Sequence, residues 1–248
     1  MPEADPRSGE LAANLAAVRR RLADACQAAG RPADDVTLVV VTKTYPAADV
    51  VRLAALGVTD VGENRDQEAA PKAEQAAAAG ATPRWHFIGQ LQRNKCRSVV
   101  RYAHMVHSVD SVRLVQALSR AAVSHAEQTG RGELDVLVQV SLDGDPSRGG
   151  AVPGEGPDPD VALDRVLAGA ASAEGLALRG LMAVAPLDWA PDRAFATLAA
   201  LAERARETYP QATVLSAGMS GDVEQAIRYG ATHVRLGSAV LGPRQYFR

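Results

Sequence analysis

The chain of 248 residues is poor in cysteine, in aromatic residues and in net charge. Two cysteines, Cys26 and Cys96, are too few for a disulfide framework, which favours a cytoplasmic protein. No run of about 18 apolar residues is present, so no membrane span is expected. Residues 1–10 are polar and lack the apolar segment of a secretory signal. A formal charge of −2 gives no general attraction to nucleic acid or to a membrane surface.

Apolar residues make up 47% of the chain, which excludes an intrinsically disordered protein. The sequence has no Cys/His cluster with zinc spacing and neither a P-loop nor a serine-hydrolase motif. His104 and His107 stand three apart on an expected strand, so they point to opposite faces and form a poor metal pair. The basic run at 92–97 lacks interleaved aromatic residues, which favours a solvated helix start over a nucleic-acid site. We therefore expect no metal and no nucleic-acid partner.

Strand and helix patterns alternate along the whole chain. The expected strands are residues 37–43, 58–63, 85–89, 105–109, 134–141, 178–184, 213–216 and 233–237. The expected helices are residues 8–30, 46–56, 67–79, a segment after Asn94, 111–128, 161–173, 194–208 and 221–229. Residues 142–160 are rich in Gly, Pro and Asp and are expected to form a loop.

Eight strands alternating with helices predict a parallel sheet, and eight is the number that closes into a (β/α)8 TIM barrel of about 250 residues. We expect this α/β fold as one domain over residues 1–248. The helix at 8–30 precedes the first strand and would cover the barrel where a last helix would otherwise lie. An open doubly wound sheet is the alternative, but Lys43-Thr44-Tyr45-Pro46 stands where it needs a Gly-rich turn.

Functional residues of such barrels lie at the C-terminal ends of the strands. The segment 216–221 (SAGMSG) leaves the seventh strand and opens a helix, and Gly237-Ser238 leaves the eighth. Glycines allow close backbone approach, and loops after these two strands often bind phosphate. The alternative is ordinary turn chemistry, with Ser220 capping the next helix.

Two basic residues interrupt apolar strands. Lys43 shares a strand face with Val39 and Val41, and an apolar, cation-rich site turns a lysine into a nucleophilic amine able to form a Schiff base. A surface lysine is the alternative. Arg235 stands in an apolar run, and a buried arginine requires an anion or another hydrogen-bond acceptor. The alternative there is an internal ion pair, for example with Glu63.

Six motifs stand in order at the expected strand ends: VTKT at 41–44, GEN at 62–64 with QE at 67–68, WHFIGQLQ at 85–92 with NK at 94–95, RGLMA at 179–183, SAGMS at 216–220 and VRLGS at 234–238. In these motifs the chain resembles the pyridoxal phosphate homeostasis proteins, relatives of the barrel domain of alanine racemase. The resemblance covers nearly the whole chain after the first helix.

The resemblance implies a site for pyridoxal 5′-phosphate (PLP). It implies that Lys43 carries PLP as an internal aldimine, a Schiff base, and that Arg235 faces the pyridine nitrogen. The phosphate is expected at Ser220, Gly237 and Ser238, in the site that the strand-end glycines also predict. The remaining cofactor-binding positions that we expect are Asn64, His86, Met182, Ser216, Gly218 and Met219. For His86, which stands between Trp85 and Phe87 on an expected strand, a satisfied core histidine is the alternative.

The resemblance also implies a PLP carrier without catalytic residues. An arginine at the pyridine nitrogen disfavours its protonation and weakens the ring as an electron sink. The chain ends soon after its eighth strand, so the tyrosine base that alanine racemase takes from a second domain is expected to be missing. We expect a monomeric protein of vitamin B6 homeostasis that buffers PLP and passes it to PLP-dependent apoenzymes. A stand-alone fold-type III amino-acid racemase and a Schiff-base aldolase are the alternatives.

Overall fold

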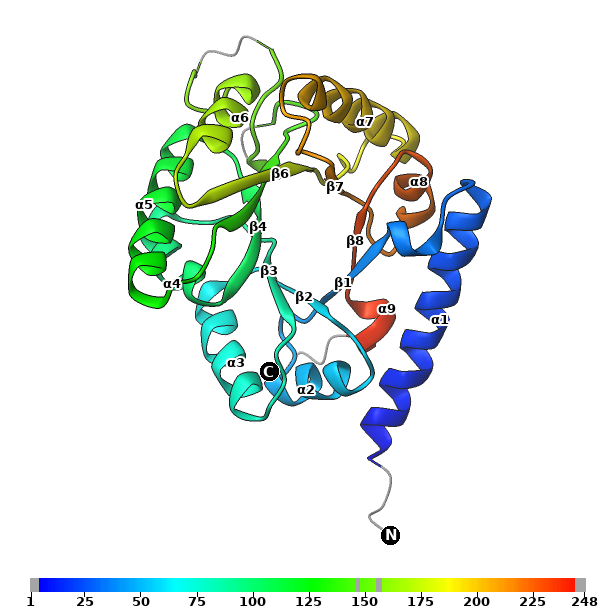
Figure 1. Cartoon of the computed structure of the whole chain (residues 1–248). Helices are drawn as coiled ribbons and strands as arrows, with labels where there is room; N and C mark the ends of the chain where they lie inside the picture. The colour runs from blue at the N-terminus through cyan, green and yellow to red at the C-terminus, as the bar shows by residue number, and fades with distance from the viewer. Residues whose placement is uncertain (1–4, 146–147, 155–157, 244–248) are drawn as a thin grey trace.

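The computed structural model describes residues 5–145, 148–154 and 158–243. Eight parallel strands pair in sequence order from β1 to β8, and β8 pairs with β1, so the sheet closes into a barrel (Figure 1). Helices surround this barrel on the outside. The expected (β/α)8 barrel is therefore confirmed, and the open doubly wound sheet is excluded.

The strands are β1 Thr37–Val41, β2 Asp60–Glu63, β3 Arg84–Phe87, β4 Ala103–Val109, β5 Leu134–Gln139, β6 Leu176–Met182, β7 Val214–Ser216 and β8 His233–Leu236. The helices are α1 Pro6–Ala28, α2 Ala47–Ala55, α3 Asp66–Ala78, α4 Cys96–Tyr102, α5 Val112–Thr129, α6 Leu163–Ser172, α7 Pro191–Thr208, α8 Val223–Arg228 and α9 Ser238–Leu241. Every expected element is present. Several strands end before the expected residue, although some of the residues that follow keep a backbone bond to the next strand: the N–H of Thr42 donates to the carbonyl oxygen of Gly62 at 2.9 Å and that of Ile88 to the carbonyl oxygen of Glu63 at 2.8 Å.

Helix α1 covers the place where β8 and β1 meet. Its residues Leu11, Leu15, Val18 and Leu22 are buried at helical spacing. The helix packs against α8 and the short α9, and Figure 1 shows it running alongside both. This placement confirms that the first helix covers the barrel beside its last strand. None of the helices in the described part of the chain is long and apolar enough to cross a membrane.

The segment 142–160 is irregular, as expected, although residues 146–147 and 155–157 lie outside the described residues. Two isolated bridges, Val140 with Ala151 and Val152 with Ala162, tie its described parts to the end of β5 and the start of α6. The segment therefore lies at the C-terminal end of the barrel, on the same side as the expected site.

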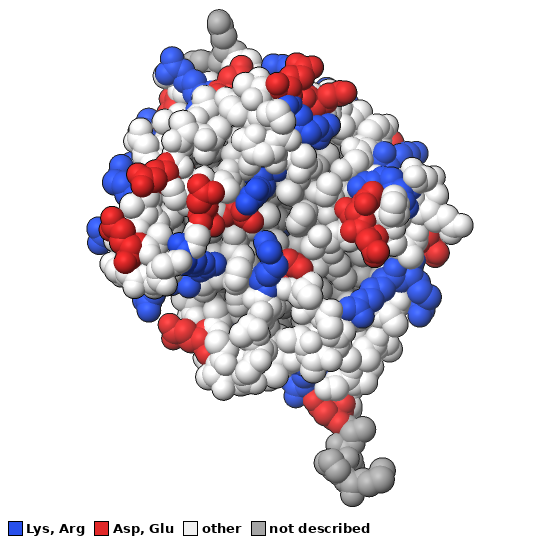
Figure 2. All heavy atoms as spheres, viewed as in Figure 1, with Lys and Arg blue, Asp and Glu red and all other residues white. Residues whose placement is uncertain are grey.

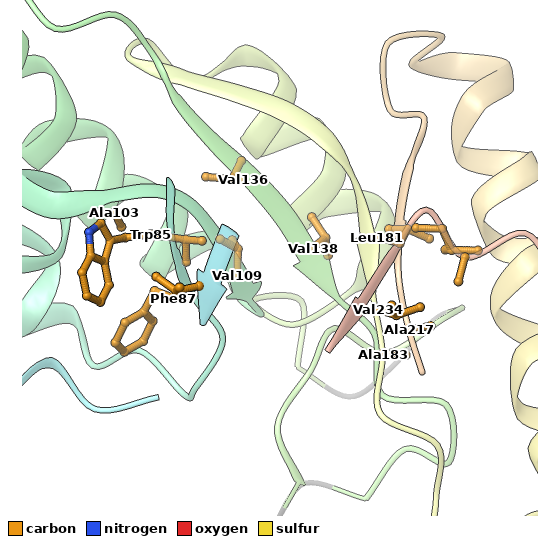
Figure 3. Close-up of a cluster of buried hydrophobic side chains, with 14 of the residues drawn as sticks. Trp85, Phe87, Ala103, Val109, Val136, Val138, Leu181, Ala183, Ala217 and Val234 are labelled. Carbon is orange, nitrogen blue, oxygen red and sulfur yellow. The ribbon is translucent and has the colours of Figure 1, made fainter. Parts of the chain in front are cut away.

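The main hydrophobic core lies between the strands and the helices. Figure 3 shows part of this core, where Trp85, Phe87, Val136, Val138 and Leu181 are among the labelled side chains. The interior of the barrel is different, because it contains a group of buried polar side chains as well as an apolar cluster. Residues of one strand alternate between these two environments, as the two-residue period of a strand requires.

Candidate functional site

Lys43 lies two residues after Val41, the last residue of β1, at the C-terminal mouth of the barrel, and is half-buried. The next residue, Thr44, has a φ of 71°, and its backbone N–H donates to Glu68 Oε2 at 3.3 Å. A positive φ is strained for a β-branched residue, and such strain is found where surrounding contacts hold a functional segment. The local backbone of Lys43 is thus fixed by a strained turn and an anchor on α3.

Arg235 lies on β8 with its side chain 5% exposed. Its Nη1 donates to Ser216 Oγ at 2.6 Å and its Nη2 to the carbonyl oxygen of Ala183 at 3.0 Å. Within the described residues no carboxylate forms an ion pair with it. The expected alternative, a pair with Glu63, is not formed, because Glu63 pairs with Lys72 between β2 and α3.

Burial lowers the pKa of Arg235 to about 10, and Asp222 opposes that shift. The guanidinium therefore remains a cation at neutral pH. A buried cation held only by neutral oxygens favours an additional electron-rich partner. This cation lies one strand away from Lys43, because β8 and β1 are neighbours and Arg235 pairs with Val39.

The loops after β7 and β8 lie against each other. Gly218 has a φ of +91°, and a Cβ there would lie 2.6 Å from the Cβ of Ala226, so the loop needs glycine at this position. The backbone N–H of Arg235 donates to the carbonyl oxygen of Gly218 at 3.0 Å. A Cβ on Gly237 would lie 3.1 Å from the carbonyl oxygen of Val41, which brings the end of β8 close to β1.

Unpaired backbone donors gather in these loops. Across the described residues, no protein acceptor binds the N–H groups of Ser220, Gly221, Gly237 or Ser238. Ser220 is half-buried and Ser238 is exposed. The alternative of a Ser220 cap is not formed, because Asp222 directly precedes α8. The loop ends therefore offer N–H and hydroxyl donors of the kind that bind a phosphate group.

Unlike these unpaired groups, the backbone N–H of Met219 has a protein acceptor, because it donates to Asp222 Oδ1 at 2.6 Å. The side chain of Met219 is 39% exposed.

Met182 is buried inside the barrel with Met105 and Leu137, so it forms part of the interior beneath the mouth. Asn64 is half-buried, and a Cβ on Gly89 would lie 2.2 Å from its carbonyl oxygen, so the Asn64 backbone packs directly on the β3 end.

His86 and Ser216 lie deeper than the mouth. His86 Nε2 lies 2.8 Å from Asp60 Oδ1, and His86 Nδ1 lies 2.8 Å from His107 Nε2. His107 Nδ1 lies 2.9 Å from Ser216 Oγ. Both ring nitrogens of His86 thus have protein partners. His104 is exposed while His107 is buried, so the two do not share a face, and the described residues contain no cluster suited to a metal ion.

Three comparisons with known proteins bear on this arrangement. The family model for the N-terminal domain of alanine racemase matches residues 13–245. The pyridoxal phosphate homeostasis protein of Mycobacterium tuberculosis H37Rv is 49% identical over 251 residues, which cover 96% of this chain and 95% of that protein. The protein of the same name from Escherichia coli K12 is 35% identical over 241 residues, covering 96% and 98%. The chain belongs to the pyridoxal phosphate homeostasis family.

Solved structures agree with this family. The structure of Synechococcus elongatus PipY with PLP bound has a TM-score of 0.74 at 30% identity, and the match covers 94% of this chain and all of PipY. Alanine racemase from Corynebacterium glutamicum, at 18% identity, has a TM-score of 0.67 and shares the barrel fold, with 94% of this chain matched to 60% of the racemase. The expected family is confirmed.

In this member of the pyridoxal phosphate homeostasis family, sequence reasoning missed three features of the site. The strain at Thr44 leaves no signal in a sequence. His107 was considered only as a metal ligand, and its bond to Ser216 depends on a register that shifts within β4. Asp60 did leave a signal, because it is an aspartate at the start of an apolar strand and an unpaired charge is not tolerated there.

Proposed function

We propose that this member of the pyridoxal phosphate homeostasis family binds PLP at the C-terminal mouth of a single barrel domain spanning residues 1–248, with Lys43 as the point of covalent attachment. One observation carries the proposal: Arg235 is a buried cation without a carboxylate partner among the described residues, on the strand next to β1, the strand that leads to Lys43. The family name of the relatives and the PLP-bound structure of PipY support the same ligand.

The residues at the mouth fit the parts of PLP. Lys43 offers a primary amine on a backbone fixed by Thr44, and PLP supplies an aldehyde that condenses with an amine and a ring that can accept negative charge. The unpaired N–H groups of Ser220, Gly237 and Ser238 would donate to phosphate oxygens.

The remaining proposed binding residues shape the site around these groups. Gly218 and Met219 would form the backbone of the loop after β7, and Asn64 directly follows β2, the other neighbour of β1. Met182, His86 and Ser216 form the wall and floor. For His86 we infer a contact through the ring alone, which is supported by the 2.8 Å distances from its two nitrogens to His107 and Asp60.

The proposed role is to carry and buffer PLP without efficient amino-acid chemistry. Arg235 can only donate hydrogen bonds, whereas enzymes that use the PLP ring as a strong electron sink place an acid at the pyridine nitrogen. A guanidinium at that position disfavours a second positive charge, so the ring accepts electrons poorly.

The proposal includes a cytoplasmic, monomeric protein that hands PLP to PLP-dependent apoenzymes. Cys26 and Cys96 are both buried free thiols, which supports a reducing compartment. A reversible covalent bond at the half-buried Lys43 would allow PLP to be released to an apoenzyme.

The lysine content of the chain makes the attachment site easy to test. The chain contains only three lysines, Lys43, Lys72 and Lys95. We expect borohydride reduction of the PLP-loaded protein to add one pyridoxyl phosphate mass at Lys43. The mass should persist in Lys95→Arg, whose lysine is partly exposed near the same mouth, and should disappear in Lys43→Arg. A label that survives Lys43→Arg would refute attachment at Lys43.

Two further outcomes test the carrier role. Steady turnover of L-alanine or L-serine into the other enantiomer would establish the racemase alternative and overturn the absence of amino-acid chemistry. A protein that takes up no PLP at all would overturn the proposed ligand.

A further inference from the structure

Five buried side chains form one continuous chain of hydrogen bonds through the interior of the barrel. It begins at Asp60, at the N-terminal end of β2, and continues through His86 on β3 and His107 on β4. It then crosses to Ser216 at the end of β7 and ends at Arg235 on β8. Each donor–acceptor distance is between 2.6 and 2.9 Å. We call these five residues the hydrogen-bond chain.

The two ends of the hydrogen-bond chain fix its direction. Arg235 can only donate, so Ser216 Oγ accepts from it. Asp60 accepts when ionised, and although burial raises its pKa, hydrogen bonds from His86 and Thr59 outweigh that effect and the net shift of the pKa is downward. Burial holds the pKa of His107 well below its usual range, so this ring is neutral.

With both ends fixed, one arrangement uses every hydrogen. The Ser216 hydroxyl donates to His107 Nδ1, His107 Nε2–H donates to His86 Nδ1, and His86 Nε2–H donates to Asp60. A cationic His86 would reverse the two middle bonds and leave the Ser216 hydroxyl without an acceptor among the described residues. Every bond therefore points from Arg235 toward Asp60.

Asp60 in turn belongs to a group of ion pairs at the N-terminal end of the barrel. Arg84 lies 3.6 Å from Asp60 Oδ1 and 3.5 Å from Asp135 Oδ2, and Arg179 lies 2.6 Å from Asp135 Oδ1. Figure 2 shows acidic and basic side chains close together near the middle of one face of the molecule. The hydrogen-bond chain thus joins this charged group to the opposite end of the barrel.

We propose, on the basis of the proposed PLP site, that Asp60, His86, His107 and Ser216 are positioning residues that hold the Arg235 guanidinium against the ligand. Aligned hydrogen bonds polarise one another, so the negative charge of Asp60 makes Ser216 Oγ a better acceptor for Arg235. The anion thereby stabilises the arginine from the far end of the barrel, and no carboxylate among the described residues forms an ion pair with the guanidinium.

The direction of the bonds can be tested without any ligand. In the purified protein near neutral pH, ¹⁵N NMR of the imidazole rings should show both His86 and His107 as neutral Nε2–H tautomers, with assignments from single histidine variants. An imidazolium or an Nδ1–H tautomer at either ring would overturn the arrangement.

The influence on the ligand is tested with three variants that each break one link: Asp60→Asn, His107→Asn and Ser216→Ala. Each should weaken PLP binding about three- to tenfold, the loss expected for one hydrogen bond, and should shift the visible absorbance band of the loaded protein. The matched control is His233→Asn, because His233 lies in the same interior, with ring centroids 6.1 Å from His86 and 6.4 Å from His107, but bonds to Thr232 instead.

The outcomes separate this proposal from the proposed function. A wild-type protein that binds PLP, with chain variants that match His233→Asn in affinity and band position, overturns the positioning role and leaves the PLP site standing. A loss of melting temperature with an unchanged absorbance band overturns it as well, because a purely structural role predicts that result. Failure of the wild-type protein to bind PLP overturns both.

Discussion

Removing Lys72 should leave the buried carboxylate of Glu63 without its cationic partner in the layer between β2 and α3. Lys72 Nζ donates to Glu63 Oε1 at 2.6 Å and to the carbonyl oxygen of Thr42 at 2.8 Å. Glu63 is completely buried, and its Oε2 has no hydrogen-bond partner in the described structure. Loss of one partner of a buried pair costs about 3–5 kcal/mol. We expect Lys72→Met to lower the free energy of unfolding by about that amount near pH 8.

The loss should depend on pH. Burial raises the pKa of Glu63, and Lys72 is the strongest influence against that rise, so the pKa rises further in Lys72→Met. Below the raised pKa the folded protein binds a proton that the unfolded chain does not, so stability increases as the pH falls, by up to about 1.4 kcal/mol per pH unit. Lys72→Met should therefore recover much of its lost stability between pH 8 and pH 5.

The assay is urea unfolding followed by far-UV circular dichroism at both pH values. Lys95→Met is the matched control, because Lys95 Nζ lies 3.9 Å from Asp66 Oδ2 and is partly exposed, so its loss should stay below about 1 kcal/mol. The double variant Lys72→Met with Glu63→Met removes both charges and should restore most of the stability. A Lys72→Met loss below about 1 kcal/mol, or an equal loss at both pH values, would refute the reasoning.

Two further predictions concern glycine and cysteine. Gly180→Ala should destabilise the barrel by more than about 3 kcal/mol in thermal or urea unfolding, because the new Cβ would lie 1.8 Å from the carbonyl oxygen of Val214. Gly9→Ala in α1, where a Cβ meets nothing within 4 Å, should stabilise the protein by up to about 1 kcal/mol. Equal effects of the two substitutions would contradict this account. Burial raises the pKa of Cys96 to about 11 and also raises that of Cys26, so neither thiol should react with a disulfide reagent near pH 8 until urea unfolds the chain. Rapid labelling of either cysteine in the folded protein would disprove the prediction that burial makes both thiols unreactive.

The barrel could be predicted from the sequence because its strands are continuous apolar runs and its helices are amphipathic. The same runs misled at their ends: Thr42 and Lys43 were expected in the first strand but follow its last residue, Val41, although the Thr42 N–H still donates to the carbonyl oxygen of Gly62. Lys43 and Arg235 were found as charges within apolar runs. Their placement at neighbouring strands followed from barrel closure.

The partners of these residues could not be predicted. Arg235 was expected to bind an anion or another hydrogen-bond acceptor, or else to pair with Glu63. Its protein acceptors are the Ser216 hydroxyl and the carbonyl oxygen of Ala183, which the sequence pattern did not identify. The contact between His86 and His107 depends on register shifts within β4, which strand patterns do not encode. The periodicity of a strand predicts whether a side chain points into the barrel or toward the helices. Which side chains then come into contact across the barrel interior depends on how all the strands pack.

The seam where β8 meets β1 decides when the molecule can finish folding. β1 takes β8 as one of its two neighbours, and Arg31 reaches the carbonyl oxygens of Ile227 and Ala231, contacts that span 196 and 200 positions of the chain. Contacts this distant in sequence carry a large loop-closure entropy and form slowly. During synthesis one edge of β1 therefore waits for β8 to emerge from the ribosome, and its open backbone donors and acceptors are exposed to mispairing until then.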